Sequence, residues 1–235
     1  MQSTRRRWQR WLKTIQYEVW TLHWNRAMHR RISEIVAANP QINYGNPLHK
    51  WMHSNYIAAT AIGLRRLIEK PQRGKKYPNL SLQVLLLQIA TCPQSISAFN
   101  IRRFYRRTEG KSPSSLLLRT QTGTLEVFPE GIKKAISQLE KRCERIERFA
   151  DKYIAHHDRK RRLPPTLGDI DTAIEAVGDL FNEVSVLPTG KFGTLESNDL
   201  GDWEAILRTP WIELQAGQSA EHEQASPEEK PPTVR

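Results

Sequence analysis

The 235-residue sequence has only two cysteines and no long hydrophobic run. Cys92 and Cys143 lie far apart and form no CxxC pair, so neither a disulfide framework nor a zinc ribbon is indicated, and both are interpreted as reduced packing residues. The apolar stretch around residues 85–87 is only a few residues long, whereas a membrane-spanning helix needs roughly 20. The N-terminal residues are basic and aromatic, unlike a signal peptide, so we expect a cytoplasmic protein without a membrane span.

The motifs of several enzyme classes are also missing. The sequence contains no GxGxxG, GxxxxGKS/T or GxSxG motif and no paired catalytic carboxylates, which gives nucleotide-binding and α/β-hydrolase folds no support. His49 and His53 are four residues apart and could meet one zinc ion on a helix face, but the glutamate of HExxH and a third ligand are missing. We interpret them as structural polar residues, assign no role to His23 and His29, and expect no metal and no cofactor.

The charge of the sequence is strongly uneven, with a net value of +11. Residues 1–162 hold 32 of the 36 basic residues and 11 of the 25 acidic ones, whereas residues 163–235 hold 4 basic and 14 acidic residues. This uneven charge favours binding of a polyanion by residues 1–162. The acidic residues of 163–235 either weaken that attraction or neutralise the basic residues within the fold. RNA or DNA is the expected partner class; the alternatives are a basic surface that only keeps the protein soluble and an acidic protein partner.

Hydrophobic periodicity predicts an all-α protein. Apolar residues recur at spacings of three and four, Thr166 is a good N-cap, and Pro129 suits the first turn of a helix. The stretch 108–128 is irregular and is expected to hold one small hairpin or extended strand. The predicted helices cover residues 5–38, 48–69, 82–90, 97–107, 129–157, 167–186 and 203–207.

Composition separates the chain into two parts. Residues 1–213 are expected to form one helical-bundle domain, because a hydrophobic content of 38% suffices for a core. Residues 214–235 contain almost no large apolar side chain and are rich in Glu, Ser, Gln and Pro, so a disordered acidic tail is expected there.

The long helix predicted from Pro129 to about His157 has two opposite faces. At about 100° per residue, an apolar stripe from Ile132 to Tyr153 lies within an arc of about 100° and faces the bundle. Almost opposite lies a basic stripe, which consists of Lys141, Arg145, Arg148, Lys152 and His156. It is either a solvated surface or a phosphate track, in which the imidazole acts as acid or base and the cations stabilise developing charge.

Further basic residues are candidates for RNA contact, together with Arg145. One cluster combines cations with aromatic rings and consists of Arg102, Arg103, Arg106 and Arg107 beside Phe104 and Tyr105. A second cluster follows His156 directly and consists of Arg159, Lys160, Arg161 and Arg162. Both clusters concentrate positive charge, which is the general requirement for holding a nucleic-acid backbone.

Aromatic residues crowd the first predicted helix among arginines. The aromatic ones are Trp8, Trp11, Tyr17, Trp20 and Trp24, and the arginines are Arg5, Arg6, Arg7 and Arg10. Such rings can stack the bases of single-stranded nucleic acid, and a basic amphipathic helix can also lie on an anionic membrane. We prefer a third interpretation, in which they are buried against other helices or a second protomer.

The segment DKYIAHHD, residues 151–158, resembles the signature of the HEPN superfamily, in particular its abortive-infection branch of the AbiU type. The signature is an arginine, a polar residue and then a histidine after four to six positions, commonly RDKxxAH. The similarity extends to the order of the long first helix, the helix containing YIAATAIGLRRLIEK, the motif helix, PPTLGDIDTAIEAVGDLFNEV and WEAILRTPW. About 200 residues are covered, so the resemblance implies an all-α, HEPN-like bundle.

The resemblance also implies a function. In active members the arginine and histidine cleave RNA without a metal, usually at a cleft between two protomers, through attack of a 2′-hydroxyl on the adjacent phosphate. His156 matches the catalytic histidine and Asp151 the polar residue, but Ala150 occupies the arginine position and looks like a core residue. Arg148 or Lys152 could supply the missing cation. The alternative is a degenerate, non-cleaving member that binds RNA or protein.

The resemblance also implies that the protein belongs to a bacterial defence or toxin-like system. A homodimer is the expected assembly, and an antitoxin or another defence protein is a further candidate partner. These expectations come from the resemblance alone and not from the composition or spacing of the residues.

Overall fold

The computed structural model describes residues 2–39, 46–71, 79–97, 100–102, 117–121, 124–155, 164–190 and 202–208. The chain forms two compact units, Met1–Glu196 and Ser197–Arg235. Helices dominate the described residues, which confirms the predicted all-α class. None of the described helices is both long enough and apolar enough to cross a bilayer. The predicted boundary at residue 213 stays a prediction, because residues 209–235 lie outside the described part.

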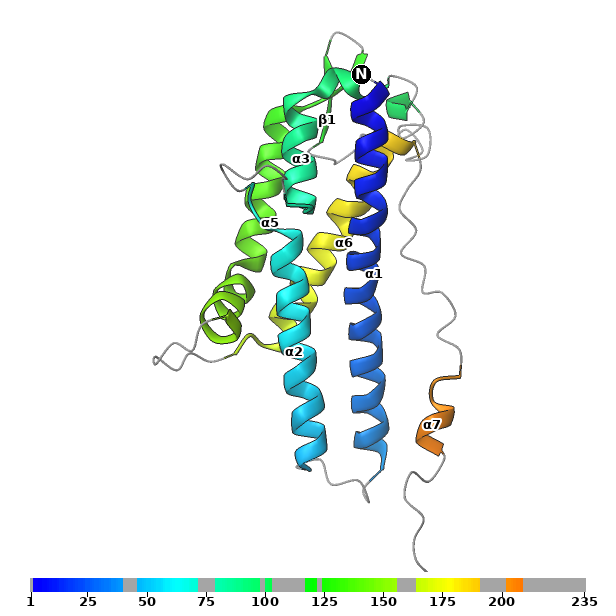
Figure 1. Cartoon of the computed structure of the whole chain (residues 1–235), viewed down its shortest axis with the longest axis vertical. Coiled ribbons are helices and arrows are strands. Elements are labelled where there is room, and N and C mark those ends of the chain that lie inside the picture. The colour runs from blue at the N-terminus through cyan, green and yellow to red at the C-terminus, as the bar shows by residue number, and fades with distance from the viewer. Residues whose placement is uncertain are drawn as a thin grey trace, which may run out of the picture. The chain divides into compact units, whose positions relative to one another are not determined.

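Two long helices, α1 (Gln2–Ala38) and α2 (Pro47–Leu67), lie side by side as a hairpin (Figure 1). Asn46 caps α2 by accepting a hydrogen bond from the Leu48 amide at 2.9 Å, and Pro47 occupies the first helical position, where its missing N–H costs nothing. Gly63 permits close packing of the two helices, because a Cβ atom there would lie 2.9 Å from Cδ2 of the buried Leu22.

The remaining long helices complete the first unit (Figure 1). They are α3 (Leu82–Thr91), α5 (Pro129–Phe149) and α6 (Leu167–Thr189), with the short 3-10 helix η1 at Pro93–Ser95. The helix α6 packs against α1 and α5, and α3 packs against α5. In the second unit the only helix among the described residues is α7 (Ala205–Arg208), which lies within the region predicted to end the helical domain.

One continuous core joins the helices of the first unit. Trp8 is completely buried in it, and its indole N–H donates to Oε1 of Gln88 at 3.0 Å. The apolar stripe of the motif helix is also buried, as predicted; its described members are Ile132, Ile136, Leu139, Cys143, Ile146 and Ala150. Burial raises the pKa of the Cys143 thiol to about 12, which agrees with an unreactive packing residue.

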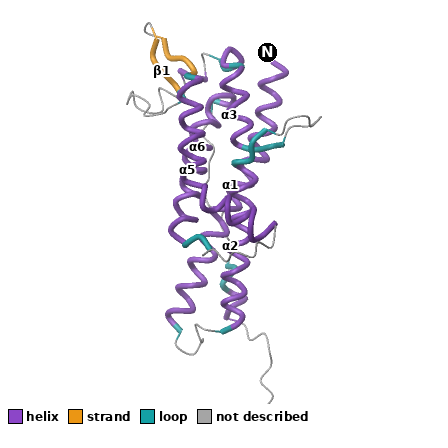
Figure 2. The backbone as a smooth tube through the Cα atoms, turned by 90° about the vertical axis from the view of Figure 1, so that its left-hand side faces the viewer, coloured by secondary structure: helices purple, strands orange, loops and turns teal. Residues whose placement is uncertain are grey.

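A small β-hairpin is inserted before α5, within the stretch predicted to be irregular. Strands β1 (Leu118–Gln121) and β2 (Thr124–Val127) pair antiparallel, with Leu118 opposite Val127. Figures 1 and 2 place this hairpin at the end of the first unit where α1 begins. Both Leu118 and Val127 are buried, so the hairpin closes that end of the core.

The C-terminal end of α6 extends further than predicted, to Thr189 instead of 186. Pro188 lies in the last turn, where its carbonyl oxygen has no donor within the helix and accepts instead from Arg5 Nε of α1 at 2.9 Å and from Gln9 Nε2 at 3.1 Å. Gly190 then ends the helix with a left-handed φ of 73°. Of the helix predicted over 97–107, residues 100–102 are helical and 103–107 lie outside the described residues.

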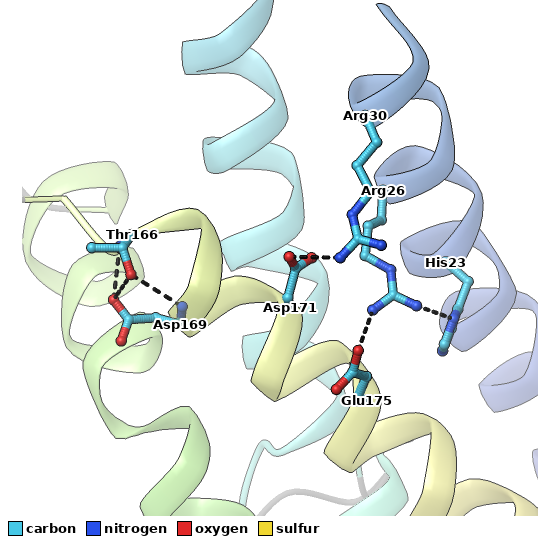
Figure 3. A network of polar contacts seen from close by, with 7 residues as sticks. All are labelled: His23, Arg26, Arg30, Thr166, Asp169, Asp171 and Glu175. Atoms are coloured by element: carbon cyan, nitrogen blue, oxygen red, sulfur yellow. Dashed lines mark hydrogen bonds and ion pairs between the residues drawn. The ribbon is translucent and has the colours of Figure 1, made fainter. Parts of the chain in front are cut away.

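The N-terminal end of α6 is fixed by a capping box (Figure 3). Thr166 Oγ1 accepts from the Asp169 amide at 3.1 Å, and the Thr166 amide donates to Asp169 Oδ2 at 2.7 Å. We expect Thr166→Ala to lower the free energy of unfolding by about 1 kcal/mol, because one orphan amide of the first turn loses its acceptor. Urea unfolding measures this change. The exposed Thr91→Ala, which removes no cap, serves as the control, and an equal loss in both variants would contradict the assignment.

Candidate functional site

The motif segment begins with a π-helical turn, η2 (Ala150–Ala155), that continues directly from α5. The sequence predicts one uninterrupted helix to about residue 157, so the change from α to π geometry is a difference from that prediction. Ala150 is 2% exposed and belongs to the core, as expected, whereas Asp151 and Lys152 are half-buried. Turns of this kind occur often at functional sites, because one inserted residue changes the direction of the side chains that follow.

An arginine from another helix reaches this turn. Arg65, near the end of α2, donates a short hydrogen bond from Nε to Oδ1 of Asp151. Both side chains are a little under half exposed, at 43% and 46%. A guanidinium has five N–H donors, and Asp151 accepts one of them. The Arg65–Asp151 pair therefore brings a permanent positive charge, with donors to spare, to the segment in which Ala150 takes the place of the motif arginine.

A further carboxyl group, Glu147, interacts electrostatically with both residues of this pair. Burial first and then the charge of Asp151 raise the pKa of Glu147, which lies one turn earlier on α5. Lys70 pairs with Glu140 at 3.1 Å, and Gln83 donates to the same oxygen at 2.8 Å. A carboxyl group with a raised pKa holds its proton at a higher pH than usual, and here burial beside the Asp151 carboxylate is the cause.

The basic stripe of α5 is partly neutralised. Arg145 pairs with Asp169 of α6 at 2.8 Å, and Arg148 forms a short ion pair with Glu144 one turn before it. Lys141 is exposed and Lys152 half-buried. Ion pairs at this level of exposure contribute about 0.2–1 kcal/mol, so a phosphate could displace them. The roles predicted for Arg145, Arg148, Asp151 and Lys152 remain predictions.

Several predicted site residues lie outside the described part of the chain. His156, the proposed catalytic histidine, is one of them, and Arg102 is described as an exposed residue at the end of its segment. The others outside the described residues are Arg103, Arg106, Arg107, Arg159, Lys160, Arg161 and Arg162. Their predicted roles rest on the sequence alone.

The acidic end of the chain neutralises part of the basic half within the fold, which is one of the two outcomes predicted from the charge split. Arg26 of α1 pairs with Glu175 of α6 at 3.2 Å, and Arg30 pairs with Asp171 at 2.8 Å (Figure 3). Figure 3 also shows His23 beside Arg26, which donates to its Nδ1 across 3.2 Å. These two ion pairs connect α1 with α6, so carboxylates of the protein itself neutralise Arg26 and Arg30.

A groove of about 710 Å³ lies between the distal parts of α1 and α2, and none of its lining residues belongs to the motif turn. The ring of His29 stacks on Tyr56 with centroids 4.0 Å apart, and its Nε2 lies 3.1 Å from Nδ1 of His53. The sequence predicts no role for His29, and its partner His53 lies on another helix, α2. Among the described residues, no group of three or more histidine, cysteine or acidic side chains could hold a metal ion.

Two histidines of α1 should make the stability pH-dependent. Burial is the main cause that lowers the pKa of His23 and of His29, followed by Arg26 and His53 respectively. Between these lowered values and the ordinary 6.5, the unfolded chain binds more protons, so stability is present at higher pH and is lost as the pH falls through 6.5. We expect the free energy of unfolding to fall from pH 7.5 to pH 5.5, and the fall to shrink in the double variant His23→Gln, His29→Gln. His222→Gln, in the predicted tail, is the control. An unchanged pH dependence in the double variant would contradict this account.

The described residues form a helical bundle with a hairpin before the motif helix and a π turn at its end, which is the all-α architecture that the HEPN resemblance implies. A family model described as AbiU2, from the HEPN superfamily, matches residues 8–206. The chain therefore belongs to the AbiU2 family, which confirms the resemblance and makes it a HEPN-type abortive-infection protein. Comparison with curated proteins and with solved structures gives no match.

Proposed function

We propose that this protein acts on RNA in a bacterial defence system and cleaves it without a metal ion at the motif turn. The observation that carries the proposal is the position of Arg65, whose guanidinium bonds Asp151 next to the buried Ala150. The superfamily reaction needs one cation and one histidine. Arg65 supplies the cation from α2, and His156 supplies the imidazole from the motif itself.

Each group then has a defined task in the cleavage. The 2′-hydroxyl attacks the adjacent phosphate, His156 moves the proton, and the 5′-oxygen leaves, so that a 2′,3′-cyclic phosphate and a 5′-hydroxyl are formed. The Arg65 donors that Asp151 does not use bind the non-bridging phosphate oxygens, on which negative charge develops. Asp151 orients the guanidinium, and Lys152 or Arg148 adds positive charge.

A second candidate function is RNA or protein binding without cleavage. It is favoured by the buried Ala150 and by the carboxylates that pair with Lys70, Arg145 and Arg148. In this case the motif turn is a structural remnant, and the net positive charge of the first 162 residues accounts for RNA affinity.

One experiment separates the two functions. The full-length protein is incubated with single-stranded and structured RNA in the presence of EDTA, and the products are resolved by gel and tested for a cyclic phosphate. Strand scission with 2′,3′-cyclic ends is the expected result. Intact RNA, bound with an affinity that falls steeply with salt, would support the second candidate. The absence of both cleavage and binding would contradict an RNA-directed function altogether.

A further inference from the structure

The outer face of α1 carries a line of cations that leads into a row of aromatic rings. Its residues follow one another at spacings of four, three, four, three and four; we call them the outer strip, and they are Arg6, Arg10, Lys13, Tyr17, Trp20 and Trp24. At about 100° per residue these six positions fall within about 80° of one another. With a rise of about 1.5 Å per residue, the outer strip is about 27 Å long.

This strip points away from the core. The core face of α1 is centred about 160° from it and consists of Trp8, Leu12, Ile15, Val19 and Leu22, all less than 5% exposed. The contacts of α1 with its neighbours also leave from other positions, since Glu18 pairs with Arg66 of α2 and Arg26 pairs with Glu175 of α6. Of the preferred interpretation, burial against other helices holds for Trp8, whereas Tyr17 is 66% exposed in the single chain, and burial against a second protomer stays a prediction.

The aromatic rings of the strip form a ladder. The ring centroids of Tyr17 and Trp20 are 6.3 Å apart with planes at 29°, and those of Trp20 and Trp24 are 6.2 Å apart at 25°. Trp20 and Trp24 are half-buried, so each tryptophan keeps accessible ring surface. Large aromatic residues on the outer side of a helix are costly to leave in water unless something covers them, and flat rings in series match the faces of successive bases.

The net positive charge of α1 favours an anionic ligand. α1 contains eight basic and two acidic residues, and both acids are engaged, Glu18 with Arg66 and Glu34 with Arg31. Arg6, Arg10 and Lys13 are exposed, and within the described ranges no carboxylate pairs with them. Free cations in line with stacked rings are the two components of single-strand binding: a positive track for the backbone and a platform for the bases.

We propose that the outer strip of α1 binds single-stranded RNA, with phosphates along Arg6, Arg10 and Lys13 and bases stacked on Tyr17, Trp20 and Trp24. This inference deepens the proposed function and rests on it for the choice of RNA, because it names unpaired RNA as the substrate class. Double-stranded RNA hides its base faces, so it cannot use the aromatic part of the strip.

The test measures binding separately from cleavage. In a His156→Ala background, fluorescence anisotropy follows a labelled single-stranded RNA and a duplex of equal length. The aromatic variant, Tyr17→Ala, Trp20→Ala, Trp24→Ala, should bind the single strand at least about 5- to 150-fold more weakly, which is the range expected for the loss of one base–aromatic stack. Trp51→Ala, which removes a 65% exposed tryptophan from α2, is the matched control and should leave the affinity unchanged.

A second variant tests the cations without touching the rings. Arg6→Gln, Arg10→Gln, Lys13→Gln changes only exposed side chains, so it keeps the core intact, and thermal unfolding checks this. The slope of log affinity against log salt should become shallower by about 2, because each phosphate contact to a single strand contributes about 0.7.

Three results would overturn the proposal. The first is an unchanged affinity for the single strand in both variants. The second is that the His156→Ala protein without further changes binds the duplex as tightly as the single strand. The third is that the aromatic variant loses binding to anionic phosphatidylglycerol vesicles while it still binds RNA. The last result would assign the strip to a membrane surface. Failure of the proposed function gives a different result from failure of the binding proposal. The protein with His156 intact would bind single-stranded RNA through the outer strip but would not cleave it.

Discussion

Replacing His156 with alanine is expected to lower the rate of RNA cleavage about 100- to 10,000-fold. A positioned acid–base group contributes that much to a proton-transfer step, and alanine can neither accept the proton of the 2′-hydroxyl nor donate one to the leaving oxygen. Single-turnover cleavage in EDTA measures the rate, and anisotropy measures RNA affinity separately. Affinity should change little, because the proton is transferred during the reaction and not during binding.

The sequence offers a matched control in the next residue. His157→Ala removes the same chemical group one position away, and its cleavage rate should stay close to that of the unmodified protein. Cleavage that persists in His156→Ala would contradict the assignment. Equal losses in the two variants would show that the segment needs its histidines for structure.

Replacing Arg65 with alanine should lower cleavage about 100- to 1000-fold, the effect of removing one donor to the charge that develops in a transition state. The following residue provides the control: Arg66→Ala removes an exposed guanidinium that pairs with Glu18 of α1 at 2.6 Å and not with the motif turn. It should cost only the small energy of a surface ion pair and leave cleavage nearly unchanged. Equal activities of the two variants would remove Arg65 from the mechanism.

A further variant separates phosphate contact from a structural role of Arg65. If the arginine served only to hold the motif turn, Asp151→Asn would be as harmful as Arg65→Ala, because either change breaks their charged hydrogen bond. If Arg65 contacts the phosphate, Asp151→Asn should lose less, since the guanidinium keeps its charge, and Arg65→Lys should retain part of the activity. Thermal unfolding of the three variants reports any loss of the bundle.

The helices were largely predictable from the sequence, because each is specified by its own residues. The apolar period that begins at Ile132 predicts the buried face of α5, and Thr166 predicts the start of α6. For the irregular stretch before α5 the sequence predicts a small hairpin or an extended strand, and the structure contains the hairpin. Local pattern and structure agree here since the same spacing determines both the helix and its buried side.

The site was less predictable, because it depends on contacts between distant residues. Arg65 and Asp151 lie 86 positions apart, and no local pattern marks an arginine on α2 as the partner of a residue after α5. The paired arginines in the segment GLRRLIEK were the one signal available. A helical projection at 100° per residue also fails beyond Phe149, because the π turn changes the angular step.

The close approach of α1 and α2 makes position 63 depend on position 22, although neither residue has a role in the proposed cleavage. Arg65 follows Gly63 by two residues, so the separation of the helices at that point determines where its side chain originates. A larger residue at 63 would meet the buried Leu22 side chain at 2.9 Å, so Leu22 would have to shift within the core. Relatives that enlarge position 63 should therefore carry a smaller side chain at position 22, and an alignment of the family should show the two positions varying together.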